Sequence, residues 1–88
     1  MHAVVFQVDV KQAWDGDVDQ ELDQIATMTK SLPGFIRGTW TTNGRQGLSF
    51  ILFETEAAAR GLADNASLPP TAGVSLRSVD VYEVVREA

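Results

Sequence analysis

The sequence predicts an α+β domain in which strands and helices follow one another in the order βαββαβ. Segments with apolar residues at every second position, typical of strands, are separated by two segments with apolar residues at helical spacing. In addition, the Asn43-Gly44 pair marks a tight reversal between two β-rich segments, which makes them a hairpin. A chain of 88 residues is of the size of one small domain, so we expect a single domain over residues 1–88.

The first two elements are a strand and a helix. Residues 3–10 alternate between a strongly apolar and a mixed face, which predicts a strand. A helix is predicted to start with Asp17 as its N-cap and to run to Leu32, where the Pro33-Gly34 pair ends it. The apolar positions of this helix are Val18, Leu22, Ile25, Met28 or Thr29, and Leu32.

Three strands and one helix complete the pattern. Residues 35–42 and 48–54 are the two strands of the hairpin. Thr55 is predicted to cap a second, alanine-rich helix. Residues 74–85 form the last strand, and the apolar residues change face near Arg77, which predicts a β-bulge there.

This order of elements is that of the ferredoxin-like fold, a four-stranded antiparallel sheet with both helices on one face, because both crossovers are right-handed. The other face of the sheet then has no helix to cover it. The third strand is nevertheless apolar on both sides. Leu48, Phe50 and Leu52 point one way, whereas Ile51 and Phe53 point the other.

An uncovered apolar face predicts a second copy of the chain. We expect the first strand to contribute Val4, Phe6 and Val8 to the face that contains Leu48, Phe50 and Leu52. In the opposite register Ala3 and Val5 would replace them, and the face would still be apolar. Leaving these side chains in water forgoes roughly 1.5–3 kcal/mol each, about 10 kcal/mol in all. We therefore expect a homodimer that associates through the helix-free face, because monomers rarely expose patches of that size.

Composition narrows the classes of partner and compartment. The chain has 12 acidic residues against 7 Lys and Arg, a formal charge of −5, which repels phosphate backbones and anionic membranes. It has no cysteine, hence no disulfide and no thiolate metal site. No signal peptide and no apolar run of about 18 residues is visible, so we expect a cytoplasmic protein without a membrane partner.

One segment favours a different class of protein. The stretch QGLSFILF is similar to the RNA-binding signature of the RNA recognition motif, a fold with the same βαββαβ order. However, Gln46 stands where that signature starts with a basic residue, and Leu48 stands where an aromatic residue stacks on a base. Together with the acidic charge, these differences predict no nucleic-acid partner.

Residues 31 to about 64 resemble the antibiotic-biosynthesis monooxygenase type of dimeric α+β barrel. The resemblance rests on the Pro33-Gly34-Phe35 entry to the second strand and on a third strand that runs directly into an acidic, alanine-rich helix. It implies a homodimer whose two sheets face each other, with a pocket between sheet and helices in each subunit.

The same resemblance implies where a pocket would be and how this chain departs from it. Enzymes of the family place an Asn and an aromatic residue, usually Trp, on the helix-facing side of the third strand, and some place a Tyr on the second helix. Ser49, Phe53 and Ala59 stand at these positions, so hydrogen bonds to a substrate would be lost. The haem-degrading branch needs a His on the second helix, which has none, and we expect no cofactor.

The predicted ligand is a small hydrophobic or aromatic molecule, bound by Arg37, Trp40, Ser49 and Phe53. Trp40 would stack on a planar ligand or pack in the core or dimer seam, and Arg37 would anchor an anion or pair with a carboxylate. No catalytic residue can be assigned. We therefore expect a ligand-binding protein or, alternatively, a cofactor-independent monooxygenase, and nucleic-acid binding of the RNA-recognition-motif type is the least favoured of the three functions.

Other residues of types that carry chemistry favour structural roles. His2 is the only histidine and lies next to the terminus, which favours a strand-edge position over acid–base catalysis. Trp14, in the loop before the first helix, could also stack on a ligand. Three aspartates have the spacing of the first three ligands in a calcium-binding loop. However, Gln20 stands where that loop needs a glycine, and Ala26 stands where it needs its final carboxylate. We therefore expect no bound metal. These aspartates instead favour the N-terminus of a helix, where negative charge is stabilised: Asp15, Asp17 and Asp19.

Overall fold

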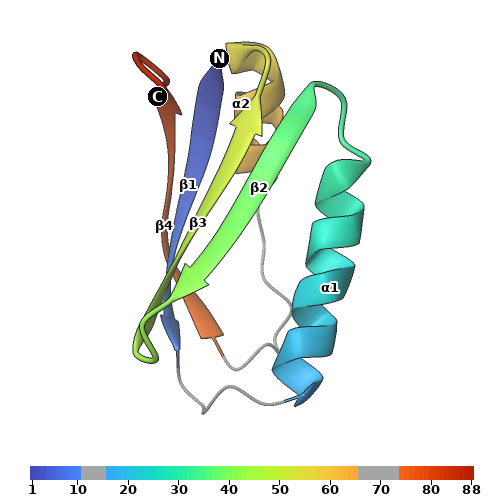
Figure 1. The fold of residues 1–88 in the computed structure, drawn as a ribbon, viewed down its shortest axis with the longest axis vertical. Coiled ribbons are helices and arrows are strands. Elements are labelled where there is room, and N and C mark those ends of the chain that lie inside the picture. Colours follow the sequence, from blue (N-terminus) through green and yellow to red (C-terminus); the bar gives the residue numbers. More distant parts are fainter. Residues whose placement is uncertain (11–15, 66–73) are drawn as a thin grey trace.

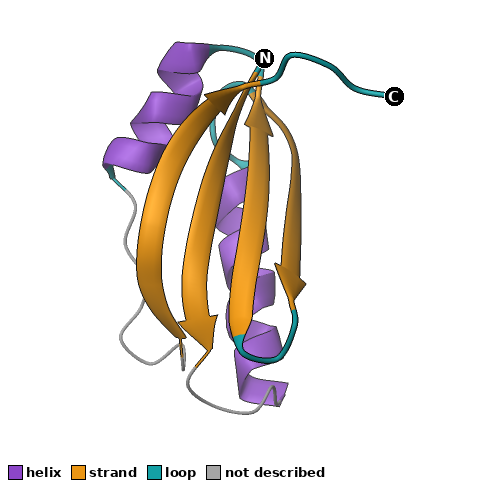
Figure 2. Cartoon of the chain, turned by 90° about the vertical axis from the view of Figure 1, so that its left-hand side faces the viewer, coloured by secondary structure: helices purple, strands orange, loops and turns teal. Residues whose placement is uncertain are grey.

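A computed structural model describes the backbone of residues 1–10, 16–65 and 74–88 (Figure 1). In chain order the elements are β1 (His2–Val10), α1 (Gly16–Lys30), β2 (Phe35–Thr42), β3 (Gln46–Phe53), α2 (Glu56–Asp64) and β4 (Val74–Glu83). The strands form one antiparallel sheet in the order β2-β3-β1-β4. In Figure 2, α1 lies behind this sheet and α2 at its upper left, and neither covers the face turned toward the viewer. The predicted α+β, ferredoxin-like arrangement is confirmed.

The core lies between the sheet and the helices. Val4 and Ile51, which are cross-strand partners, are fully buried there together with Phe53 and Ala59. The ring of Phe35 meets that of Phe53 edge to face, with centroids 6.3 Å apart and an interplanar angle of 82°. The small Ala59 side chain lets α2 lie close to the strands.

Of the two residues predicted as alternatives for the inward side of α1, Thr29 is buried and Met28 is exposed. The Thr29 hydroxyl donates to the carbonyl oxygen of Ile25 at 2.7 Å. This bond satisfies the hydroxyl within the helix, so that the residue can be buried at little cost. The helix begins at Gly16, one residue before the predicted cap.

Local signals for the turns and the second helix are confirmed. The side-chain oxygen of Asn43 accepts hydrogen bonds from the backbone N–H groups of Arg45 (2.9 Å) and Gln46 (2.8 Å), which closes the hairpin. Before α2, the hydroxyl of Thr55 accepts from the N–H of Ala58 at 3.2 Å. This bond is the predicted N-cap.

The register of β1 is opposite to the main expectation. Val4 and Phe6 pack with the core on the helix-facing side, and Ala3 and Val5 lie on the helix-free side. The reason is that both sides of this strand are apolar, and the larger side chains fill the core that the chain itself encloses. Val8 is on the same side as Val4 and Phe6, and its cross-strand partner is Gly47. A Cβ added to Gly47 would lie 2.8 Å from the Cγ2 atom of Val8.

The predicted bulge in β4 is confirmed. Gln7 of β1 pairs with Ser78, but the next residue, Val8, pairs with Leu76. Arg77 is therefore the extra residue of a β-bulge. Beyond the bulge, the valines of β4 pack against the core as the change of face predicted.

Candidate functional site

Two of the four predicted ligand-binding residues lie side by side. Trp40 of β2 and Ser49 of β3 are cross-strand partners. Both lie on the helix-facing side, because Ser49 is two residues from the buried Ile51 and Trp40 packs against the core. Each is only partly buried, so an indole and a hydroxyl lie next to each other on this face and both remain partly accessible.

The position of Trp40 depends on the glycine two residues before it. A Cβ on Gly38 would lie 2.6 Å from Cη2 and 2.8 Å from Cζ3 of the indole. It would also lie 3.2 Å from the Cδ1 atom of Ile51. The indole therefore rests directly on the backbone of its own strand, where only glycine leaves room.

The other two predicted residues do not join this pair. Phe53 is fully buried and packs against Phe35, so it fills the core. It is four residues along β3 from Ser49, a distance of about 13 Å. Arg37 lies on the helix-free side, opposite Leu52, and its guanidinium is 3.0 Å from the carboxylate of Glu87.

A bulge in β2 explains the position of Arg37. Phe35 pairs with Phe53 and Arg37 pairs with Leu52, so Ile36 is an extra residue between them. Without this bulge, Arg37 would share the helix-facing side with Phe35. The bulge therefore turns Arg37 to the helix-free face and brings Trp40, three residues further along, to the helix-facing one.

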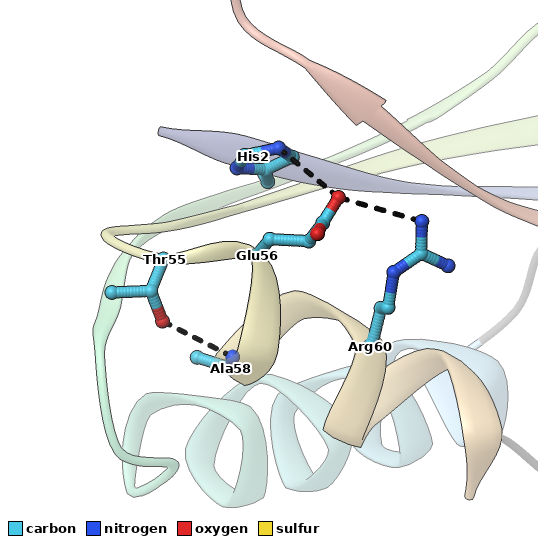
Figure 3. A network of polar contacts seen from close by, with 5 residues as sticks. All are labelled: His2, Thr55, Glu56, Ala58 and Arg60. Carbon is cyan, nitrogen blue, oxygen red and sulfur yellow. Dashed lines mark hydrogen bonds and ion pairs between the residues drawn. The ribbon is translucent and has the colours of Figure 1, made fainter.

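A polar network links β1 to the start of α2 (Figure 3). The Nε2 atom of His2 and the guanidinium of Arg60 lie 3.6 Å and 3.4 Å, respectively, from the same carboxylate oxygen of Glu56. The Nδ1 atom of His2 is buried and has no hydrogen-bond partner within the described residues. The sequence alone did not reveal this network, because the pairing of β1 with β3 is needed to bring His2 next to α2.

The network is better suited to holding elements together than to catalysis. No substrate can reach Nδ1 of His2 without movement of its neighbours, because that atom is shielded from solvent. Glu56 and Arg60 are exposed and four residues apart on one helix. Pairs of this kind contribute a few tenths of a kcal/mol to a helix. The contact between His2 and Glu56 is the one that links α2 to the first strand.

The helix-free side of the sheet is apolar along its middle. We call its six apolar residues the open face. Its flanks are polar, with Thr39 and Thr41 on β2 and Asp80 on β4, as their pairing shows. Three members of the open face are exposed: Leu48, Phe50 and Tyr82. The open face consists of Ala3, Val5, Leu48, Phe50, Leu52 and Tyr82.

The described part of the chain offers neither a metal site nor a membrane span. No group of three or more His, Asp or Glu residues there is placed to hold a metal ion. Asp17 and Asp19 belong to helix α1, whereas a calcium site needs a loop; Asp15 and Trp14 lie outside the described residues. Neither described helix has the length and apolar character needed to cross a membrane.

Comparison with solved structures gives the relatives of this fold. SnoaB, a cofactor-independent oxygenase from Streptomyces nogalater, superposes with a TM-score of 0.68 over 98% of this chain and 95% of its own, at 10% identity. The chain has the fold of the antibiotic-biosynthesis monooxygenases. A protein from Deinococcus radiodurans named as such a monooxygenase gives a TM-score of 0.65, at 15% identity, over 100% of this chain and 96% of its own.

A third structure with this monooxygenase-type fold binds a tetrapyrrole. MhuD, solved with two manganese protoporphyrin IX molecules in each active site, gives a TM-score of 0.53 at 12% identity, covering 100% of this chain and 98% of its own. No protein-family model matches the chain, and no curated protein is similar to it in sequence. At these identities the similarity establishes the fold and leaves the activity to be argued from the residues.

Proposed function

We propose that the protein is a homodimer that binds a planar, apolar small molecule between the sheet and the helices. The observation that supports this most is the Trp40–Ser49 pair on the inner face of the sheet. An indole offers a flat surface for stacking, and a hydroxyl can donate one hydrogen bond and accept others. Small-molecule sites combine an apolar wall with a few polar groups in this way.

The proposed dimer rests on the open face. Two of its exposed large side chains, Leu48 and Phe50, lie two residues apart on the inner strand β3, and the third, Tyr82, lies on the edge strand β4. Figure 2 shows this face of the sheet, which neither described helix covers. A two-fold interface must be complementary to itself, which an apolar centre with a polar rim satisfies. A second copy of the chain would remove this surface from water.

Tryptophan fluorescence tests the ligand site. In a Trp14→Phe variant, Trp40 is the only tryptophan, since the chain contains two. Titration with hydroxylated naphthoquinones and flavonoids should quench its emission in a saturable way and raise the melting temperature. The matched control is Trp40→Phe, in which Trp14 reports and no saturable quenching is expected. Saturable quenching confined to the control variant, or absent from both, would contradict the proposed site.

A second function, cofactor-independent oxygenation, is supported by the similarity to SnoaB over nearly the whole chain. An electron-rich phenolic substrate, acting as the sole reductant, would supply four electrons and two hydrogens to O₂ (RH₂ + O₂ → R=O + H₂O). One oxygen atom would enter the substrate, and the other would leave as water. In this chain, Ser49 would hold the substrate oxygen and Trp40 would hold its ring.

Oxygen consumption tests this second function. The protein should consume O₂ with dihydroxynaphthalenes in the presence of a chelator and without added flavin. Ser49→Ala should lower the rate about 3- to 10-fold, the value of one neutral hydrogen bond. Arg60→Ala, at the surface of α2, serves as the control and should leave the rate unchanged. Oxygen uptake no faster than the protein-free blank, with ligand binding intact, would leave binding as the function.

A further inference from the structure

The last five residues, 84–88, form a tail that crosses the sheet. The N–H of Val84 donates to the carbonyl oxygen of Met1 at 2.9 Å, and Glu87 pairs with Arg37 at 3.0 Å. The strands that carry these anchors, β4 and β2, are at opposite edges of the sheet. The tail must therefore pass the ends of β1 and β3, and Figure 2 shows it leaving β4 toward the β2 side.

The exposed fraction of the open face varies along β3. Leu52 is 7% exposed, whereas Phe50 and Leu48 on the same side of the same strand are 43% and 40% exposed. Leu52 is the cross-strand partner of Arg37, the residue that holds the tail. The tail is thus anchored beside the buried end of β3, whereas Phe50 and Leu48 stay accessible.

A second copy seated on the open face must contact the tail or displace it. Val85, in the tail, is 85% exposed, the highest fraction among the large apolar side chains of the described residues. Displacement would break the Arg37–Glu87 pair and leave Val85 in water, whereas contact keeps this pair and adds Val85 to the buried surface. Contact therefore removes more apolar surface from water.

We propose that the C-terminal tail is part of the dimer interface and that Val85 is buried against the partner subunit. This inference rests on the proposed homodimer and adds a segment outside the sheet to its contact surface. Arg37 and Glu87 would then lie at the rim, where exposed ion pairs orient segments more than they stabilise them. The occupant of the open face is a second copy of this chain.

Thiol labelling tests the inference without depending on changes in stability. The chain has no cysteine, so Val85→Cys introduces a unique thiol. Its reaction rate with a soluble disulfide reagent is measured below and above the dimer midpoint, which sedimentation equilibrium determines. We expect labelling at least tenfold slower in the dimer. Met28→Cys, exposed on α1, is the control and should react equally in both states. Equal rates for Val85→Cys in monomer and dimer would overturn the inference.

Dissociation constants of the dimer distinguish a failure of the tail proposal from a failure of the proposed dimer. Val85→Asp should raise the constant at least tenfold, Phe50→Asp should raise it further, and Met28→Asp should leave it unchanged. If Phe50→Asp weakens the dimer and Val85→Asp does not, the tail lies outside the interface and the proposed dimer stands. If Phe50→Asp has no effect, or if the natural chain is monomeric at high concentration, the proposed dimer fails and the tail inference fails with it.

Discussion

The contact between Gly38 and Trp40 shows how one absent side chain shapes the candidate site. The indole occupies the volume in which any Cβ at position 38 would stand. The aromatic surface offered to a ligand is therefore set by backbone contact, with Ile51 beside it. Interiors packed at this density respond to the addition of a single methyl group.

Gly38→Ala should accordingly lower the free energy of unfolding by about 1–3 kcal/mol, because the indole must move. It should also weaken ligand quenching of Trp40. Gly61→Ala is the matched control, because a methyl group added at that position of α2 would meet no side chain or neighbouring element within 4 Å. There, alanine should raise the free energy of unfolding by up to about 1 kcal/mol. Urea denaturation of both variants checks the pair, and similar losses at the two positions would contradict the packing argument.

Among the elements, the stability of α2 depends most clearly on a single side chain, that of its N-cap residue Thr55. It is a helix of 9 residues, shorter than isolated helices that are stable in water, so its cap and its packing must support it. Thr55 supplies the cap, and Ala59 supplies the close approach to the sheet. The network of His2, Glu56 and Arg60 adds a tie at the same end.

Thr55→Ala should lower the free energy of unfolding by about 1 kcal/mol, since the N–H of Ala58 loses its acceptor. Thr55→Ser, which keeps the hydroxyl, should retain most of the stability. Thr27→Ala is the control on α1, because the hydroxyl of Thr27 bonds only to the carbonyl of Asp23 within an exposed turn. Thermal unfolding of the three variants distinguishes a cap from a general effect of removing a hydroxyl; equal losses for Thr55→Ala and Thr27→Ala would argue against the cap.

The elements also show which parts of the structure local sequence can reveal. The turn at Asn43, the cap at Thr55 and the bulge at Arg77 were predictable, because each depends on residues adjacent in the chain. The register of β1 was not, because Val4 and Val5 are equally apolar and only pairing with β3 decides which of them is buried. The side of Arg37 was not predictable either, since a bulge at Ile36 with no strong local signal reverses it.

At the scale of the whole molecule, the sheet has one face closed by its own chain and one face that is mostly open. A domain of 88 residues buries only about 60–65% of its unfolded surface, so its stability as a single copy is modest. Covering Phe50 and Leu48 with a second copy would add to that stability through mass action.

The melting temperature should therefore rise with protein concentration, by several degrees between about 1 and 100 μM, because association stabilises only the folded state. Phe50→Asp should remove this dependence and give a single-subunit mass. Scanning calorimetry combined with light scattering provides both measurements. A melting temperature independent of concentration, together with a single-subunit mass for the natural chain, would contradict the proposed assembly.

The bulge at Arg77 also affects how far association can extend. β4 is an edge strand, and a regular edge would offer unpaired backbone groups as a template for further strands. At Arg77 the ladder is interrupted and a cationic side chain, paired with Asp9, is exposed. We expect an edge interrupted in this way to discourage the addition of a further strand along β4.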